Sequence, residues 1–170
     1  MGSDTTHTGH QSALTTGEKE LWRGFLRFSG NVISAVERDL FAATGLSGAD
    51  FQILARLHES EDQRIGQKRL GELTGWTTTR LSHQLARMQT RGFVERAPAG
   101  HGRLMTISLT DTGRRTYESA LPVHASSVRT HFLRHFDATA ANIGLRFTCD
   151  DEGFELDIES RSQLRRTRGG

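Results

Sequence analysis

The chain of 170 residues is poor in several features that define whole classes of protein. Its one cysteine, Cys149, excludes an intrachain disulfide, and we expect a reducing cytoplasm as its compartment. It contains no apolar run of about 18 residues, which argues against a transmembrane span and a membrane partner. Residues 1–17 are polar and lack the basic-then-apolar order of a signal peptide, so they predict a flexible N-terminal arm.

Motifs of enzyme chemistry are also missing. No glycine-rich phosphate loop, nucleophile elbow or suitable carboxylate pair occurs in the sequence. A redox-sensing thiol needs neighbouring cations, whereas Cys149 is followed by Asp150 and Asp151. We therefore expect neither catalysis nor a cofactor.

The hydrophobic share of 35% is modest for a chain of this length. A monomer with so few apolar residues is short of core, and helices buried between subunits would supply the missing burial. The composition therefore favours an oligomer.

Charge is distributed unevenly, although the formal net charge is only +2. The segment Asp150–Glu159 holds six acids and no base, so the rest of the chain carries +8. Seven basic residues lie from Lys68 to Arg103, against two acids, Glu72 and Glu95. A basic region attracts phosphates and indicates a nucleic-acid partner, although an ordinary solvated surface has a similar composition.

The spacing of apolar residues predicts a long first helix over Glu18–Thr44, ended by Gly45. Ser47 is a suitable cap for a second helix, and Asp50 places a carboxylate in its first turn. A short strand is expected at Arg64–Ile65.

The segment Gln67–Gly92 predicts two helices joined by a tight glycine turn, over Lys68–Leu73 and Thr78–Arg91. This pattern is typical of a helix-turn-helix whose second helix enters the major groove of DNA. The inward positions are expected to be Leu70, Leu73, Leu81, Leu85 and Met88.

Two strand-like runs follow, Phe93–Ala97 and Leu104–Leu109, with proline and glycine between them. They predict a hairpin, which completes a winged helix-turn-helix at about residues 47–110. Thr110 or Asp111 is expected to cap a second long helix that runs to about Phe136 and bends near Pro122.

The outer face of the second short helix is expected to recognise DNA. Arg80 can offer its guanidinium to guanine and Gln84 its amide to adenine, while Arg87 and Arg91 suit the DNA backbone or surface ion pairs. Hydroxyl groups near the positive helix end suit phosphates, and the hairpin tip can place Arg103 in a minor groove beside His101. The predicted DNA-binding set is Thr77, Thr78, Thr79, Arg80, Ser82, His83, Gln84, Arg87, His101 and Arg103.

From about Glu18 to Phe136 the chain resembles the MarR family of bacterial transcriptional regulators. Three blocks carry the resemblance: LSGADFQIL from Leu46, LGELTGWTTTRLSHQLARMQTRGFVER from Leu70, and LMTISLTDTGR from Leu104. The resemblance implies a mainly α (α+β) fold, in which long dimerisation helices at about 18–44 and 111–147 flank the winged helix-turn-helix.

The resemblance also implies a function. Members of the family bind a palindromic operator in double-stranded DNA as homodimers, usually as repressors that a small-molecule effector releases. The family's effector pocket lies between the dimerisation helices and the winged domain. On this chain, the residues expected there are Trp22, Arg23, Arg27, His58 and Trp76.

The chain departs from the family at two places. The wing usually carries an acidic residue shortly before its arginine, and here Gly100, His101 and Gly102 precede Arg103. The usual final amphipathic helix is also missing. A short helix is expected at Ala138–Phe147, followed by a divergent, disordered tail over residues 148–170.

Two alternative functions remain open from the sequence. His131 and His135 stand four residues apart and His124 lies seven residues before His131, a spacing that can chelate zinc in a metal-responsive regulator. Phe132 follows the first histidine of the pair where a zinc protease has glutamate, so hydrolase chemistry is not expected. The other alternative is a winged-helix module that binds proteins and not DNA.

Overall fold

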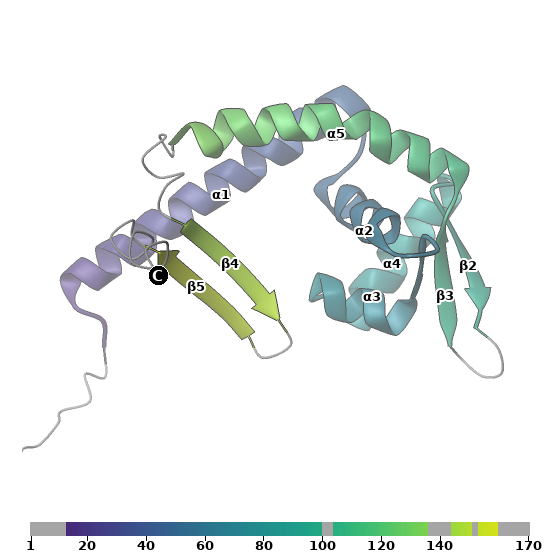
Figure 1. The fold of residues 1–170 in the computed structure, drawn as a ribbon, viewed down its shortest axis with the longest axis horizontal. Helices are drawn as coiled ribbons and strands as arrows, with labels where there is room; N and C mark the ends of the chain where they lie inside the picture. Colours follow the sequence, from purple (N-terminus) through teal and green to yellow (C-terminus); the bar gives the residue numbers. More distant parts are fainter. Residues whose placement is uncertain (1–12, 100–103, 136–143, 151–152, 160–170) are drawn as a thin grey trace, which may run out of the picture.

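The computed structural model describes residues 13–99, 104–135, 144–150 and 153–159 of the chain (Figure 1). It is mainly helical with a small three-stranded antiparallel sheet, so the predicted mainly α (α+β) winged fold is confirmed. The elements are α1 (Thr16–Thr44), α2 (Gly48–Glu59), β1 (Arg64–Gly66), α3 (Gln67–Thr74), α4 (Thr78–Thr90), β2 (Val94–Pro98), β3 (Met105–Leu109), α5 (Asp111–His131), the 3-10 turn η1 (Leu133–His135), β4 (Gly144–Asp150) and β5 (Gly153–Glu159).

The two long helices, α1 and α5, lie against each other beside the winged unit (Figure 1). Thr110 caps α5 by accepting a hydrogen bond from the Gly113 amide at 2.9 Å, and Gly45 ends α1 with a φ of 70°, as the sequence predicted. Helix α5 is shorter than predicted, because it ends at His131 and continues only as η1. None of the helices in the described ranges is long and apolar enough to cross a membrane.

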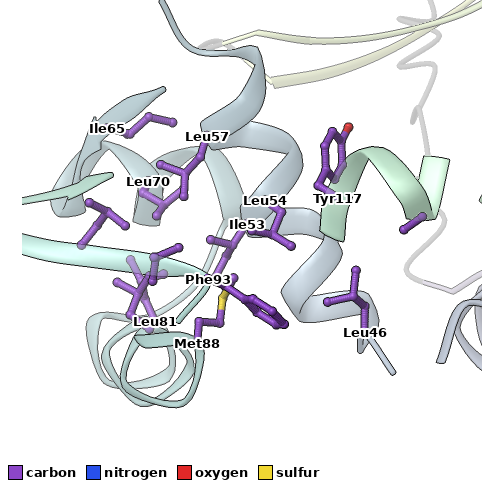
Figure 2. Close-up of a cluster of buried hydrophobic side chains, with 14 of the residues drawn as sticks. Leu46, Ile53, Leu54, Leu57, Ile65, Leu70, Leu81, Met88, Phe93 and Tyr117 are labelled. Carbon is purple, nitrogen blue, oxygen red and sulfur yellow. The ribbon is translucent and has the colours of Figure 1, made fainter. Parts of the chain in front are cut away.

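The hydrophobic core lies where α2, α3, α4 and the sheet meet (Figure 2). Of the five predicted inward positions, four are almost fully buried: Leu70, Leu81, Leu85 and Met88. The fifth prediction is wrong, because Leu73 is 36% exposed. It lies on the outer surface of α3, in a shallow hollow shared with Arg64 and Arg69.

The winged sheet has the strand order β1-β3-β2, and Ile107 of β3 is its buried centre, paired with Ile65 on one side and Arg96 on the other. The start of α5 packs directly on the end of this sheet. A Cβ atom at Gly113 would lie only 2.1 Å from the Phe93 carbonyl oxygen, so this contact requires glycine.

The C-terminal segment differs from the prediction. The predicted helix over Ala138–Phe147 is wrong for Gly144–Phe147, which belong to β4. Strand β4 pairs antiparallel with β5, which lies in the segment predicted to be the tail. The physical reason is an apolar period of two, which favours strands over helices. Residues 138–143 and 160–170 lie outside the described residues. The alternating apolar positions are Leu145, Phe147, Cys149, Phe154, Leu156 and Ile158.

Candidate nucleic-acid interface

The turn between α3 and α4 has the tight geometry that a helix-turn-helix needs. Gly75 closes α3 with a φ of 66°, and Thr77 caps α4 by accepting a hydrogen bond from the Arg80 amide at 3.3 Å. A Cβ at Gly71 would lie 3.6 Å from a methyl group of Leu81, so the two helices pack closely at this point. Helix α4 is thereby held with its N-terminal end at the surface.

The exposed face of α4 holds most of the predicted DNA-binding residues. Six of them are exposed and Ser82 is half-buried. No acid stands in the first turn, so nothing there offsets the positive end of the helix dipole. This exposure is what contact with DNA requires, and the contacts themselves stay a prediction. The six are Thr77, Thr78, Thr79, Arg80, His83 and Arg87.

The side chain of Arg80 contacts the ring of Trp76, a residue that the family resemblance placed in the effector pocket. Its guanidinium carbon lies 4.2 Å from the centre of the Trp76 ring, within the range of a cation–π contact. Trp76 also packs against the core, so the ring is a fixed support. This contact orients the first basic side chain of α4.

Gln84 does not belong to the exposed face. It is 4% exposed, and its Nε2 donates a hydrogen bond to Asp50 Oδ1 at 2.6 Å. The prediction that its amide reads adenine is therefore wrong in this structure. The reason is helical spacing, because a residue three positions after Leu81 shares the inward stripe with Leu81 and Leu85.

The two arginines farther along α4 have different surroundings. Arg87 is exposed, and its Nη2 donates to Gln84 Oε1. Arg91, just after the helix, forms the surface ion pair that the sequence suggested, because its Nη1 lies 2.9 Å from Asp50 Oδ2. Arg87 therefore remains a candidate for the DNA backbone, whereas Arg91 is occupied within the protein.

The tip of the wing, with His101 and Arg103, lies outside the described residues. The described base of the wing approaches α3, where Arg96 Nη2 donates to Gln67 Oε1 at 2.9 Å. A hollow of about 620 Å³ lies between α3, the start of α4 and the wing strands. Trp76, Thr78 and Arg96 are among its lining residues.

The residues predicted to bind an effector do not line one cavity. Trp22 stacks on Phe25 at 5.8 Å on the exposed N-terminal half of α1, where Arg23 and Arg27 are also exposed. His58 packs on the ring of Tyr117 and lies 3.6 Å from a carboxylate oxygen of Glu118. Trp76 lies at the helix-turn-helix, so the described part of the single chain does not bring the five residues together.

A different hollow lies between α1, α2 and α5, with a volume of about 500 Å³. Its walls are largely apolar, and its polar groups include Gln52, Arg56 and His124. Burial lowers the pKa of His124, whose ring stacks on Phe51 at 4.4 Å. The sequence missed this hollow because its residues come from three helices whose packing cannot be derived from spacing.

The predicted metal site is also wrong. His131 Nε2 lies 2.8 Å from Asp39 Oδ2, His135 meets the ring of Phe28 edge-on at 5.6 Å, and His124 stacks on Phe51. Within the described parts of the chain, no group of three or more histidine, cysteine or acidic side chains could hold a metal ion. Helix α5 ends at His131, so the i, i+4 spacing to His135 does not place the two rings on one helical face.

Helix α1 carries a set of exposed apolar side chains, most of them in its N-terminal half. Leu21 is 77% exposed and Phe25 is 55% exposed, values that are high for large apolar residues. An exposed apolar stripe of this size is typical of an interaction surface. The exposed members on α1 are Leu21, Trp22, Phe25, Leu26, Phe28, Ile33 and Phe41.

Known proteins resemble this chain in both sequence and structure. A sequence profile described as the MarR family matches residues 44–104. AbsC, a MarR family transcriptional regulator from Streptomyces coelicolor, is 32% identical, with 74% of this chain and 85% of AbsC covered and a TM-score of 0.69. No curated protein sequence matches the chain.

Two further solved structures were determined with a bound partner. Sco3205, a MarR family transcriptional regulator from Streptomyces coelicolor in complex with DNA, is 26% identical, with 74% of this chain and 80% of Sco3205 covered and a TM-score of 0.71. CouR from Rhodococcus jostii RHA1, bound to p-coumaroyl-CoA, is 24% identical, with 65% of this chain and 78% of CouR covered and a TM-score of 0.57. The likeness to CouR concerns the fold alone.

Proposed function

Because this chain belongs to the MarR family of transcriptional regulators, we propose that it is a homodimeric repressor that binds an inverted repeat and leaves it when a small molecule binds. That the chain is a DNA-binding regulator and not an enzyme follows from the family. The proposed parts are the dimer, the operator symmetry, the sign of regulation, the effector and action in the cytoplasm.

One observation carries the proposal for DNA: the exposed, acid-free N-terminal end of α4. Thr77 caps that end, and Arg80 projects from it against the ring of Trp76. A recognition helix needs such an end, because base edges in the major groove are met by its first residues. The DNA complex of Sco3205 supports the same use of the fold.

The exposed apolar stripe of α1 supports the homodimer. Burying one large apolar side chain contributes about 1.5–3 kcal/mol, and several on α1 are uncovered in the single chain. A two-fold dimer would present two copies of α4 to half-sites whose centres lie about 10 base pairs apart. An inverted repeat matches that symmetry.

We propose the hollow between α1, α2 and α5 as the effector site, in place of the five residues predicted from the sequence. Its volume of about 500 Å³ suits a small organic molecule, and Arg56 and His124 offer polar contacts among apolar walls. Since the hollow touches both a long helix and the winged unit, a ligand there can change how the two pack. CouR shows that this fold accommodates an organic ligand.

Selection of bound sequences from a random duplex DNA library tests the proposal. We expect a palindrome whose half-site centres lie about 10 base pairs apart. Recovery of a single half-site would contradict the dimeric reading. Recovery of no sequence would contradict DNA binding and favour the protein-interaction alternative. A reporter under the recovered operator, compared with and without the protein, distinguishes repression from activation.

A further inference from the structure

Asp50, in the first turn of α2, is a buried carboxylate that receives hydrogen bonds from three parts of the chain. It is 4% exposed. Ser47 donates to its Oδ2 through the backbone amide at 3.0 Å and through the hydroxyl at 2.8 Å, which closes the cap of α2. Gln84 of α4 donates to Oδ1 at 2.6 Å, and Arg91 donates to Oδ2 at 2.9 Å.

Arg91 extends this network to a third helix. Its second terminal nitrogen, Nη2, donates to the Gly45 carbonyl oxygen at 3.0 Å, at the residue that ends α1. The guanidinium also lies over the ring of Phe93, 4.4 Å from its centre. One side chain thus joins the end of α4, the start of α2 and the end of α1.

The geometry needs the planar fork of arginine. One guanidinium nitrogen meets the carboxylate and another meets the carbonyl, and a lysine ammonium is a point charge that cannot reproduce both directions. The Asp50 carboxylate is buried, so the loss of one of its donors leaves an incompletely paired charge, which is costly. The arrangement is therefore stiff as well as specific.

We propose that Asp50, Gln84 and Arg91 form a clamp that fixes the direction of α4 relative to α1 and thereby sets the half-site spacing that the dimer reads. This inference rests on the proposed function, because spacing has meaning only for two recognition helices joined through their long helices. In such a dimer a small rotation of α4 about its C-terminal end moves its N-terminal end along the groove. The clamp residues themselves need not touch DNA.

Helix α4 has 13 residues, so its N-terminal end lies about 18 Å from the C-terminal end that Arg91 holds, at about 1.5 Å per residue. A rotation of 10° at the clamp moves that end by about 3 Å, close to the rise of one base pair of about 3.4 Å. A change of this size at the clamp is therefore large enough to shift the preferred half-site spacing by one base pair. Base readout by the first turn of α4 does not depend on it.

The test compares Arg91→Lys with the wild-type chain in a library of two fixed half-sites separated by variable spacers. The wild type is expected to favour one spacing over its neighbours by about tenfold or more. For Arg91→Lys we expect the same half-site sequence but a preference reduced to about threefold or less. Thermal unfolding of both proteins verifies that the variant is folded under the binding conditions.

Arg114→Lys is the matched control. Arg114 is exposed to a similar degree as Arg91 and also pairs with an aspartate, Asp111, at 2.7 Å, but both partners lie within α5. This variant is expected to keep the wild-type spacing preference. If it broadens the preference as much as Arg91→Lys does, the effect is not specific to the clamp and the proposal fails.

A second variant keeps the test decisive if Arg91→Lys unfolds. The double substitution Asp50→Asn with Arg91→Gln removes both charges together, so no unpaired buried charge remains. It is expected to broaden the spacing preference in the same way. Uniformly weaker binding at every spacing would show that the network only stabilises the fold, which overturns the clamp and leaves the proposed function intact. If the wild type selects no DNA, both proposals fail.

Discussion

The guanidinium of Arg80 lies over the ring of Trp76, which packs against the core, and its central carbon is 4.2 Å from the ring centre. Trp76 precedes the cap of α4 and packs against buried residues of the winged unit, so the ring has little freedom to move. An exposed arginine normally loses much rotamer freedom when it binds a base. Here part of that ordering is already present in the protein alone.

Replacement of Arg80 by alanine is expected to weaken operator binding by about 1–3 kcal/mol and to relax specificity at one base pair of each half-site. The reason is the loss of a guanidinium that suits guanine O6 and N7. Titration of selected operator variants by fluorescence anisotropy measures both effects. Unchanged affinity together with unchanged specificity would contradict a base contact by Arg80.

Replacement of Trp76 by leucine probes the support of Arg80 in the same assay. It is expected to weaken binding by about 0.5–1 kcal/mol in the wild-type background, the worth of an exposed cation–π contact. In the Arg80→Ala background the same change should have almost no effect on binding, because the supported side chain is gone. Additive losses would show that Trp76 acts independently of Arg80.

The α1–α5 contact is expected to depend on acid pH through Asp39. Hydrogen bonds from Ser127 and then from His131 hold the pKa of Asp39 below its usual value. A folded-state pKa that is depressed contributes stability above the unfolded-state pKa, and this stability is lost as the pH falls through the folded-state pKa. The melting temperature of the wild type should therefore drop at acid pH more than that of Asp39→Asn. If the melting temperatures of both proteins fall equally at acid pH, this role of Asp39 is contradicted.

Substitution of Gly113 by alanine is expected to destabilise the fold by about 1–3 kcal/mol. The added methyl group would collide with the Phe93 carbonyl, a backbone atom that cannot rotate away. Chemical denaturation measures the change. Gly30→Ala, in α1, is the control, because a Cβ at Gly30 would meet no other atom within 4 Å. This substitution should stabilise the helix by about 0.5–1 kcal/mol. Equal effects of the two substitutions would contradict the packing argument.

The limits of sequence reasoning are clearest on α4. The apolar spacing of Leu81 and Met88 is local, so the inward stripe and the helix ends could be predicted. The burial of Gln84 follows from the same local spacing, but its hydrogen bond does not, because its partner Asp50 is 34 residues away in the sequence. The histidine pattern misled for the same reason, since His131 is paired with Asp39 of another helix.

The C-terminal hairpin does have a local signal, because its apolar residues alternate with a period of two, which favours strands. The family resemblance predicts helices at this end of the chain, and the two signals conflict. The hollow between α1, α2 and α5 had no local signal at all, because it exists only after the three helices have packed.

Substitution of Phe25 by aspartate is expected to shift the protein from dimer to monomer at micromolar concentration. Phe25 is 55% exposed in the single chain, and in the proposed dimer it would be buried, where an unpaired carboxylate is strongly unfavourable. Ser34→Asp is the matched control, because nine residues correspond to two and a half turns of helix and place it on the opposite face of α1. Static light scattering measures the mass of each variant. The monomer should bind the palindrome more weakly than the control does, since its two half-sites must be occupied independently. If Phe25→Asp remains dimeric while Ser34→Asp dissociates, the interface lies on the other face of α1.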